Sequence, residues 1–106
     1  MKYLRYRTEG KKTSEIRNEI LYMIASARAI GAELVRIDIT FSDAQSDKNL
    51  RTALRFLKEL KSAGKIQLYA TKESFLASAV EAQYLLNKYA ERIAFDSDDS
   101  FVYVKL

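Results

Sequence analysis

A short run between a predicted strand and a predicted helix combines a glycine, two lysines and two hydroxyl side chains. The residues are Gly10, Lys11, Lys12, Thr13 and Ser14. Backbone N–H groups at the start of a helix, together with the helix dipole, favour a bound anion. The lysine side chains add positive charge at the same place. The run is therefore a candidate site for a small anionic ligand such as phosphate.

The same run lacks the first glycine of a nucleotide-binding P-loop. That motif requires a glycine five residues before its last one, and this chain has Arg5 at that position. An ordinary polar loop, whose Thr13 or Ser14 caps the helix that follows, is the favoured alternative.

Acidic residues gather near the end of a second predicted strand and in the loop beyond it. They are Asp38, Asp43 and Asp47. In open α/β sheets the crevice beyond the carboxyl ends of the strands is the usual ligand site, and carboxylates there can hold Mg²⁺ through water. A structural role is favoured, because Asp43 suits a turn and Asp47 or Ser46 suits a helix N-cap. The three carboxylates are kept as candidate metal ligands.

Aromatic and basic residues alternate with apolar ones in several predicted strands, which would place them together on one face of a sheet. Rings that stack on bases and cations that meet phosphates are what a single-stranded RNA requires. A second subunit covering this face is the favoured alternative, since Tyr and Arg are enriched at protein interfaces. The candidate residues of this face are Tyr3, Arg5, Arg7, Arg36, Tyr69, Phe101, Tyr103 and Lys105.

The chain contains neither histidine nor cysteine. This composition excludes Ser-His-Asp and Cys-His nucleophiles, His/Cys metal cages, redox dithiols and disulfides. Asp, Glu, Lys and Tyr remain for acid–base catalysis, but no pair is marked by its spacing. An enzyme is not excluded, although a non-enzymatic role is favoured, and we expect no cofactor.

The hydrophobic pattern predicts alternating strands and helices in the order βαβαβαββ. Apolar residues with helical spacing predict a first helix ending near Gly31 and a second ending near Gly64, where glycine tolerates a positive φ. A third helix is predicted from Thr71 or Ser74 to Ala90, and its apolar surface is wider than one sheet needs. The predicted strands are 3–8, 35–41, 66–70, 92–95 and 101–106.

These elements predict an α/β fold with a mostly parallel central sheet and a C-terminal antiparallel hairpin formed by residues 92–95 and 101–106. Fully buried parallel strands are apolar on both faces, whereas Arg36 and Asp38 alternate with apolar residues in strand 35–41. We therefore predict two layers with a partly open sheet face. The alternative is three layers, with the third helix crossing to that face.

The 106 residues are sufficient for one domain, 1–106, and their net charge is +4. No segment has the length of a membrane span or of a signal-peptide core, so we expect a cytoplasmic protein that does not associate with membranes. The wide apolar third helix, with Tyr84 and Tyr89, predicts self-association. The favoured function is a non-enzymatic binding or regulatory homo-oligomer. Alternatives are a single-stranded RNA-binding module on the sheet face and a phosphate- or Mg²⁺-dependent enzyme at the strand ends.

Overall fold

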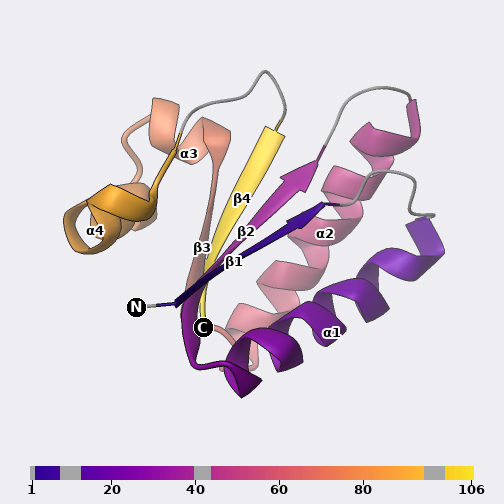
Figure 1. Ribbon diagram of the computed structural model, residues 1–106. Coiled ribbons are helices and arrows are strands. Elements are labelled where there is room, and N and C mark those ends of the chain that lie inside the picture. Colours follow the sequence, from indigo (N-terminus) through magenta and orange to yellow (C-terminus); the bar gives the residue numbers. More distant parts are fainter. Residues whose placement is uncertain (1, 8–12, 40–43, 95–99) are drawn as a thin grey trace.

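A four-stranded mixed sheet separates two pairs of helices (Figure 1). The computed structural model describes the backbone of residues 2–7, 13–39, 44–94 and 100–106, and the side chains of residues 14–38, 48–94 and 100–106. The strands are β1 (Lys2–Arg7), β2 (Ala32–Ile39), β3 (Leu68–Thr71) and β4 (Ser100–Lys105). The α-helices are α1 (Ile16–Ala29), α2 (Ala44–Ser62), α3 (Lys72–Leu76) and α4 (Val80–Tyr89), with 3₁₀ turns at Thr13–Glu15 and Ala90–Arg92.

The strand order across the sheet is β1-β2-β4-β3. β1 and β2 are parallel, whereas β4 is antiparallel to both of its neighbours, β2 and β3. In the register, Val35 faces Val104 and Ile37 faces Val102. The last strand of the chain therefore lies inside the sheet and joins two strands that helix-containing connections have already separated.

The predicted sheet is wrong in its pairing. β1, β2 and β3 run in the same direction, but β4 is inserted between β2 and β3, so only β1 and β2 form a parallel pair. The C-terminal hairpin does not form either, because Ala90–Arg92 is a 3₁₀ turn and Ile93 and Ala94 belong to no strand. Local apolar patterns indicate extended backbone, and they do not identify the strand that pairs with it.

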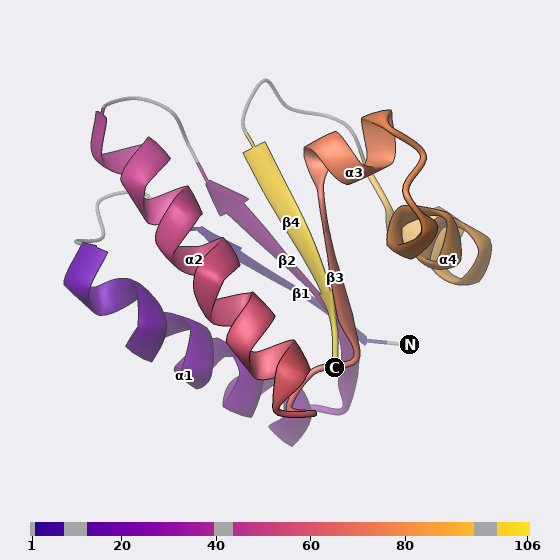
Figure 2. The ribbon, with the colours of Figure 1, turned by 180° about the vertical axis from the view of Figure 1, so that it is seen from behind.

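The first helical layer, α1 and α2, covers one face of the sheet (Figure 2). The apolar residues of α1 that recur at helical spacing are buried in this layer, namely Ile16, Ile20, Met23, Ile24 and Ala27. Gly31 and Gly64 follow the two helices with φ of 73° and 72°, as the predicted helix ends require. The buried residues of this layer are aliphatic except for Phe56, and the strands contribute Val35, Ile37, Val102 and Val104.

The second helical layer, α3 and α4, covers the opposite face of the sheet (Figures 1 and 2). The strands contribute Leu34, Ala70, Phe101 and Tyr103 to this side, and the helices contribute Phe75, Ala82, Leu85 and Tyr89. The predicted two-layer domain with a partly open face is therefore wrong, and the chain folds with three layers. The apolar surface of the third predicted helix is wide because it buries residues on this second face.

The third predicted helix is interrupted after α3. Thr71 and Ser74 form a capping box at the start of α3, each side chain accepting a hydrogen bond from the other residue's backbone N–H. Ser78 then adopts a φ of 54°, and α4 begins at Val80. A left-handed residue cannot continue an α-helix, so the chain changes direction between the two segments. Within the described part of the chain, no helix is both long enough and apolar enough to cross a membrane.

Candidate functional site

Arg36 is the most deeply buried cation among the described side chains, at 1% exposure. It lies in the middle of β2, and the alternation of that strand directs it toward α3 and α4. Its Nε donates a hydrogen bond to Oδ1 of Asp38 at 2.7 Å, and Asp38 is itself 3% exposed. Burial opposes the positive charge, but the hydrogen bonds to Asp38 and Tyr103 outweigh it and raise the pKa of the guanidinium. The group is therefore a permanently charged part of the core.

The Tyr103 hydroxyl connects Arg36 to the segment that precedes β4. It accepts hydrogen bonds from Nη1 of Arg36 at 3.0 Å and from the backbone N–H of Ala94 at 2.9 Å, and it donates to the carbonyl of Arg92 at 3.4 Å. Nη1 of Arg36 also donates to the carbonyl of Ala94 at 2.8 Å. These bonds satisfy backbone groups that a strand neighbour would otherwise satisfy. They explain why the apolar run from Ile93 does not pair as a strand.

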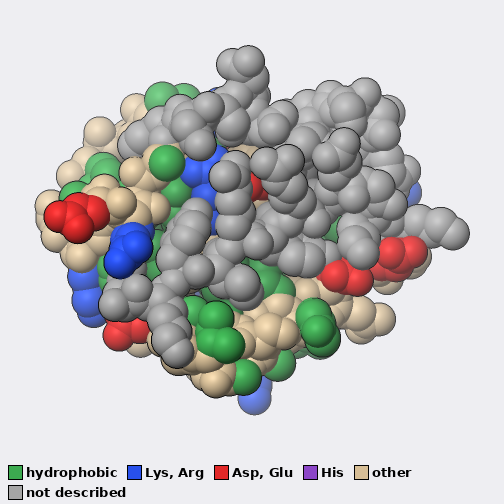
Figure 3. Space-filling view, viewed as in Figure 1, with side chains coloured by type: hydrophobic (Ala, Val, Ile, Leu, Met, Phe, Trp, Pro, Cys, Tyr) green, Lys and Arg blue, Asp and Glu red, His purple; other side chains and the backbone are tan. Residues whose placement is uncertain are grey.

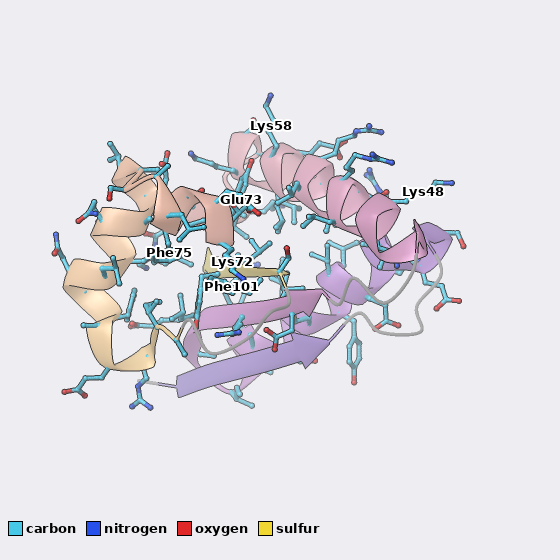
Figure 4. All side chains as sticks on the ribbon, turned by 90° about the horizontal axis from the view of Figure 1, so that it is seen from above. Lys48, Lys58, Lys72, Glu73, Phe75 and Phe101 are labelled. Carbon is cyan, nitrogen blue, oxygen red and sulfur yellow. The ribbon has the colours of Figure 1, made fainter. Side chains whose placement is uncertain are left out.

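Three aromatic rings complete this cluster. The Arg36 guanidinium lies 4.6 Å from the ring centre of Phe101 and 5.5 Å from that of Tyr103. Phe75 of α3 meets Phe101 and Tyr103 at centroid distances of 5.9 and 5.8 Å, and Figure 4 shows Phe75 reaching from its helix toward Phe101 on β4. Edge-to-face rings and a stacked cation are mutually favourable in a site that excludes water. The cluster attaches the second helical layer to the sheet.

Four of the predicted sheet-face residues are not accessible at the surface. Arg36, Phe101, Tyr103 and Lys105 are all buried, because α3 and α4 lie over them. Tyr69 packs on the opposite side of the sheet, against the α1/α2 core. Tyr3, Arg5 and Arg7 lie in the edge strand β1, where the backbone pairing is described and the side chains are not. The structure therefore brings Arg36, Phe101 and Tyr103 together as core, where the two rings are not available to stack on RNA bases.

The candidate anion site falls mostly outside the described residues. Gly10, Lys11 and Lys12 lie outside the described residues, whereas Thr13 and Ser14 lie in the 3₁₀ turn before α1. The N-cap of α1 is Glu15, one residue after Ser14 and two after Thr13, and it makes no side-chain cap hydrogen bond.

The candidate metal ligands are not brought together by any described contact. Asp38 is paired with Arg36, Asp43 lies outside the described residues, and Asp47 lies in the first turns of α2, where the side chain is not described. The predicted caps Ser46 and Asp47 are therefore inside the helix, which begins at Ala44. Among the described side chains, no group of three or more carboxylates could hold a metal ion.

An open groove of about 530 Å³ lies beside the end of α4. Tyr89 closes one side, and its hydroxyl donates to Oε2 of Glu33 at 3.3 Å. Burial raises the pKa of Tyr89, and the neighbouring Glu33 carboxylate adds to that rise while Lys88 opposes it. Charges of both signs line the groove, so it selects neither anions nor cations. The lining residues are Glu33, Asn87, Lys88, Tyr89, Ala90, Glu91 and Arg92.

Large apolar side chains are exposed on the outer side of the second helical layer. Leu76 at the end of α3 is 74% exposed, Val80 at the start of α4 is 81% exposed, and Tyr84 is 41% exposed. We call these three residues the α3/α4 apolar patch. Val80 and Tyr84 are four residues apart and share one ridge of α4. Lys88 continues the ridge, with its Nζ 5.9 Å from the centre of the Tyr84 ring.

A second set of exposed apolar residues lies on α1. Leu21, Tyr22 and Ile30 are exposed, but their positions around the helix do not form one stripe. Figure 3 shows hydrophobic side chains reaching the surface along the lower edge, where α1 lies.

Tyr84 was expected at an interface from the sequence and is exposed, whereas Tyr89, expected there as well, is buried. Leu76 and Val80 could have been separated from the buried positions only by knowing where the helix breaks.

No protein-family model matches this chain, and no significantly similar curated protein or solved structure was found.

Proposed function

We propose that this domain is a non-enzymatic binding or regulatory module that acts in the cytoplasm as a homo-oligomer. The single observation that carries the proposal is the exposure of Leu76, Val80 and Tyr84 on one layer of the molecule. Water contact with a contiguous apolar patch is unfavourable, and such patches mark interaction sites. Arg36 and Asp38 are ionisable residues of the sheet, and they are buried and hydrogen-bonded to each other inside the core.

The charges around the α3/α4 apolar patch favour a second copy of the same chain as the occupant. Glu81 and Lys88 are seven residues apart on α4 and therefore lie on the same side of the helix. When two copies of α4 pack antiparallel about a two-fold axis, Glu81 of each copy approaches Lys88 of the other. Within one molecule Glu81 also lies 3.9 Å from Lys61 Nζ, and this contact is exposed to solvent. The apolar ridge of Val80 and Tyr84 then lies along the centre of the contact, where helices pack by ridges and grooves.

Self-association is tested by measuring molar mass in solution. Light scattering of the wild-type protein should show a species heavier than the 12.2 kDa monomer. The double variant Leu76→Gln/Val80→Gln should return the mass to that of the monomer, because it removes the two most exposed apolar side chains from the contact. Its far-UV circular dichroism should be unchanged, since neither side chain is buried.

The matched control is Leu21→Gln/Tyr22→Gln, which removes two exposed apolar side chains from α1. This variant should keep the oligomer mass of the wild type. A wild-type protein that remains monomeric at high concentration would contradict the proposal. Loss of the oligomer in the α1 variant, with the α3/α4 variant unaffected, would show that the contact lies on the α1/α2 layer and would also contradict the proposal.

A further inference from the structure

The groove at the end of α4 brings together two segments that are remote in the sequence. Residues 87–92 form the last turn of α4 and the 3₁₀ turn that follows it, and Glu33 comes from the start of β2. We call this groove the α4 groove. Its volume of about 530 Å³ lies within the range of small-molecule sites. The groove is therefore large enough for a ligand of the size of an amino acid or a dipeptide.

A carboxylate with a fixed orientation lies in the α4 groove. Oε2 of Glu33 accepts a hydrogen bond from the hydroxyl of Tyr89 at 3.3 Å, and Tyr89 itself is only 4% exposed. Because a carboxylate has acceptor positions for about four hydrogen bonds, this contact orients Glu33 and leaves it able to accept from a further donor. The C-terminal end of α4 adds partial negative charge to the same groove. These groups together favour an ammonium ion.

Arg92 supplies a positive charge to the same groove. Its side chain is exposed, and within the part of the chain that the structure describes it makes no hydrogen bond or ion pair. The other cation of the groove, Lys88, already lies against two rings, with its Nζ 5.5 Å from the centre of Tyr89 and 5.9 Å from that of Tyr84. A planar guanidinium can bind a carboxylate through two parallel hydrogen bonds. Arg92 is therefore better suited than Lys88 to bind a carboxylate.

We propose that the α4 groove binds a small zwitterion, namely an amino acid or a dipeptide with both ends uncapped. Glu33 binds the ammonium group of this ligand, and Arg92 binds its carboxylate. A ligand with both charges gains both contacts, whereas a simple anion or cation meets one attractive and one repulsive group. Residues of one copy of the chain line the groove, so this proposal does not depend on self-association.

The test is a titration of the isotope-labelled protein with the dipeptide alanyl-alanine, followed by NMR. Changes in amide shifts should concentrate at Glu33 and at residues 87–92. The dissociation constant should be about 1 mM, because an open groove covers only part of a small ligand. Acetylating the amino group of the dipeptide, or converting its carboxylate to an amide, removes one charge at a time. Each capped dipeptide should bind at least about tenfold more weakly.

Two single variants assign each end of the ligand to one residue. Arg92→Gln should weaken binding of the uncapped dipeptide about tenfold and leave binding of the dipeptide amide unchanged, because the amide has no carboxylate for Arg92 to bind. Glu33→Gln should likewise weaken binding of the uncapped dipeptide and leave binding of the acetylated form unchanged. Unchanged amide shifts away from the groove will show that both variants remain folded.

The matched control Lys65→Gln/Glu73→Gln removes one exposed charge of each sign outside the groove. It should bind the uncapped dipeptide as tightly as the wild type does. Weakening in this control equal to that in the groove variants would show that general surface charge is responsible, and would overturn the proposal.

Three other results would also overturn it. They are the absence of shift changes at about ten times the expected dissociation constant, shift changes centred outside the groove, and equal affinity for the capped and uncapped dipeptides. The variant Leu76→Gln/Val80→Gln should bind the dipeptide like the wild type, which separates a failure of this proposal from a failure of self-association. Loss of binding in that variant would show that the site requires a second copy, contrary to the proposal.

Discussion

The two helical layers cover the same sheet with different chemistry. The α1/α2 layer consists of two long uninterrupted helices over an almost wholly aliphatic core. The α3/α4 layer consists of two short helices separated by a strained serine, over aromatic rings and a buried ion pair. Aliphatic packing tolerates many arrangements, whereas a buried charge requires particular partners at particular distances. The comparison indicates that the buried ion pair and aromatic rings hold the α3/α4 layer in a specific position.

Removing Arg36 should have the largest effect on this comparison. We expect Arg36→Met to lower the free energy of unfolding by about 3–5 kcal/mol, because it removes the guanidinium that pairs with the buried Asp38 carboxylate. The matched control is Ile37→Val, which trims the neighbouring β2 residue on the aliphatic side and should cost about 1 kcal/mol. Urea unfolding of the three proteins measures both values.

The double variant Arg36→Met/Asp38→Leu separates the cost of an unpaired charge from the value of the pair. Because it removes both charges of the pair, it should recover more than half of the stability that Arg36→Met loses. If the double variant is no more stable than the single one, the layer depends on the hydrogen bonds of Arg36 to Tyr103 and Ala94 instead.

Tyr89 should give a smaller, pH-dependent effect within the α3/α4 layer. Its folded-state pKa is raised above the ordinary value near 10 by burial. The folded state therefore holds the proton more tightly than the unfolded state, so this contribution is complete below pH 10 and is lost as the pH rises through the folded-state pKa. At pH 7, Tyr89→Phe should cost about 1 kcal/mol through the lost hydrogen bond to Glu33.

Unfolding free energies of wild type and Tyr89→Phe should converge as the pH rises above 10, because the wild type then loses the contribution of the neutral hydroxyl. The control Tyr22→Phe removes the hydroxyl from a tyrosine that is 73% exposed. A difference between wild type and Tyr89→Phe that stays constant over this range would contradict the assignment of the pKa to burial.

The smallest effect is expected at Ser78, which separates α3 from α4. Because glycine has no side-chain penalty at positive φ, Ser78→Gly should stabilise the protein by about 0.5–1 kcal/mol. The opposite sign is expected for Ser62→Gly at the end of α2, where glycine weakens a helix. Thermal unfolding should therefore move in opposite directions for the two changes. A shared direction would indicate that the strain at Ser78 is unimportant.

Features that depend on a single helix or strand could be predicted from the sequence. The alternation in β2 correctly assigned Val35 and Ile37 to one face and Arg36 and Asp38 to the other, and the two glycines after α1 and α2 have the expected positive φ. The aliphatic layer was therefore largely predictable, because burial of one helix stripe against one strand face follows from spacing alone.

Features that depend on distant partners could not be predicted in this way. The segment after α4 has the pattern of a strand, but its backbone bonds to Tyr103 and Arg36, which are remote in sequence. The polar face of β2 looked exposed because nothing near Arg36 in sequence reveals that Asp38, Phe101 and Tyr103 would enclose it.

The position of β4 inside the sheet has a consequence for biosynthesis. β1, α1, β2 and α2 can assemble as the chain leaves the ribosome, because β1 and β2 pair directly. β3, by contrast, has no strand to join until Ser100–Lys105 has been translated and released from the exit tunnel. Until then β2 presents an open edge, which is the condition in which nascent chains recruit chaperones or pair wrongly. β4 therefore completes the sheet after the other strands have been made, and slowing translation before β4 should prolong exposure of the β2 edge.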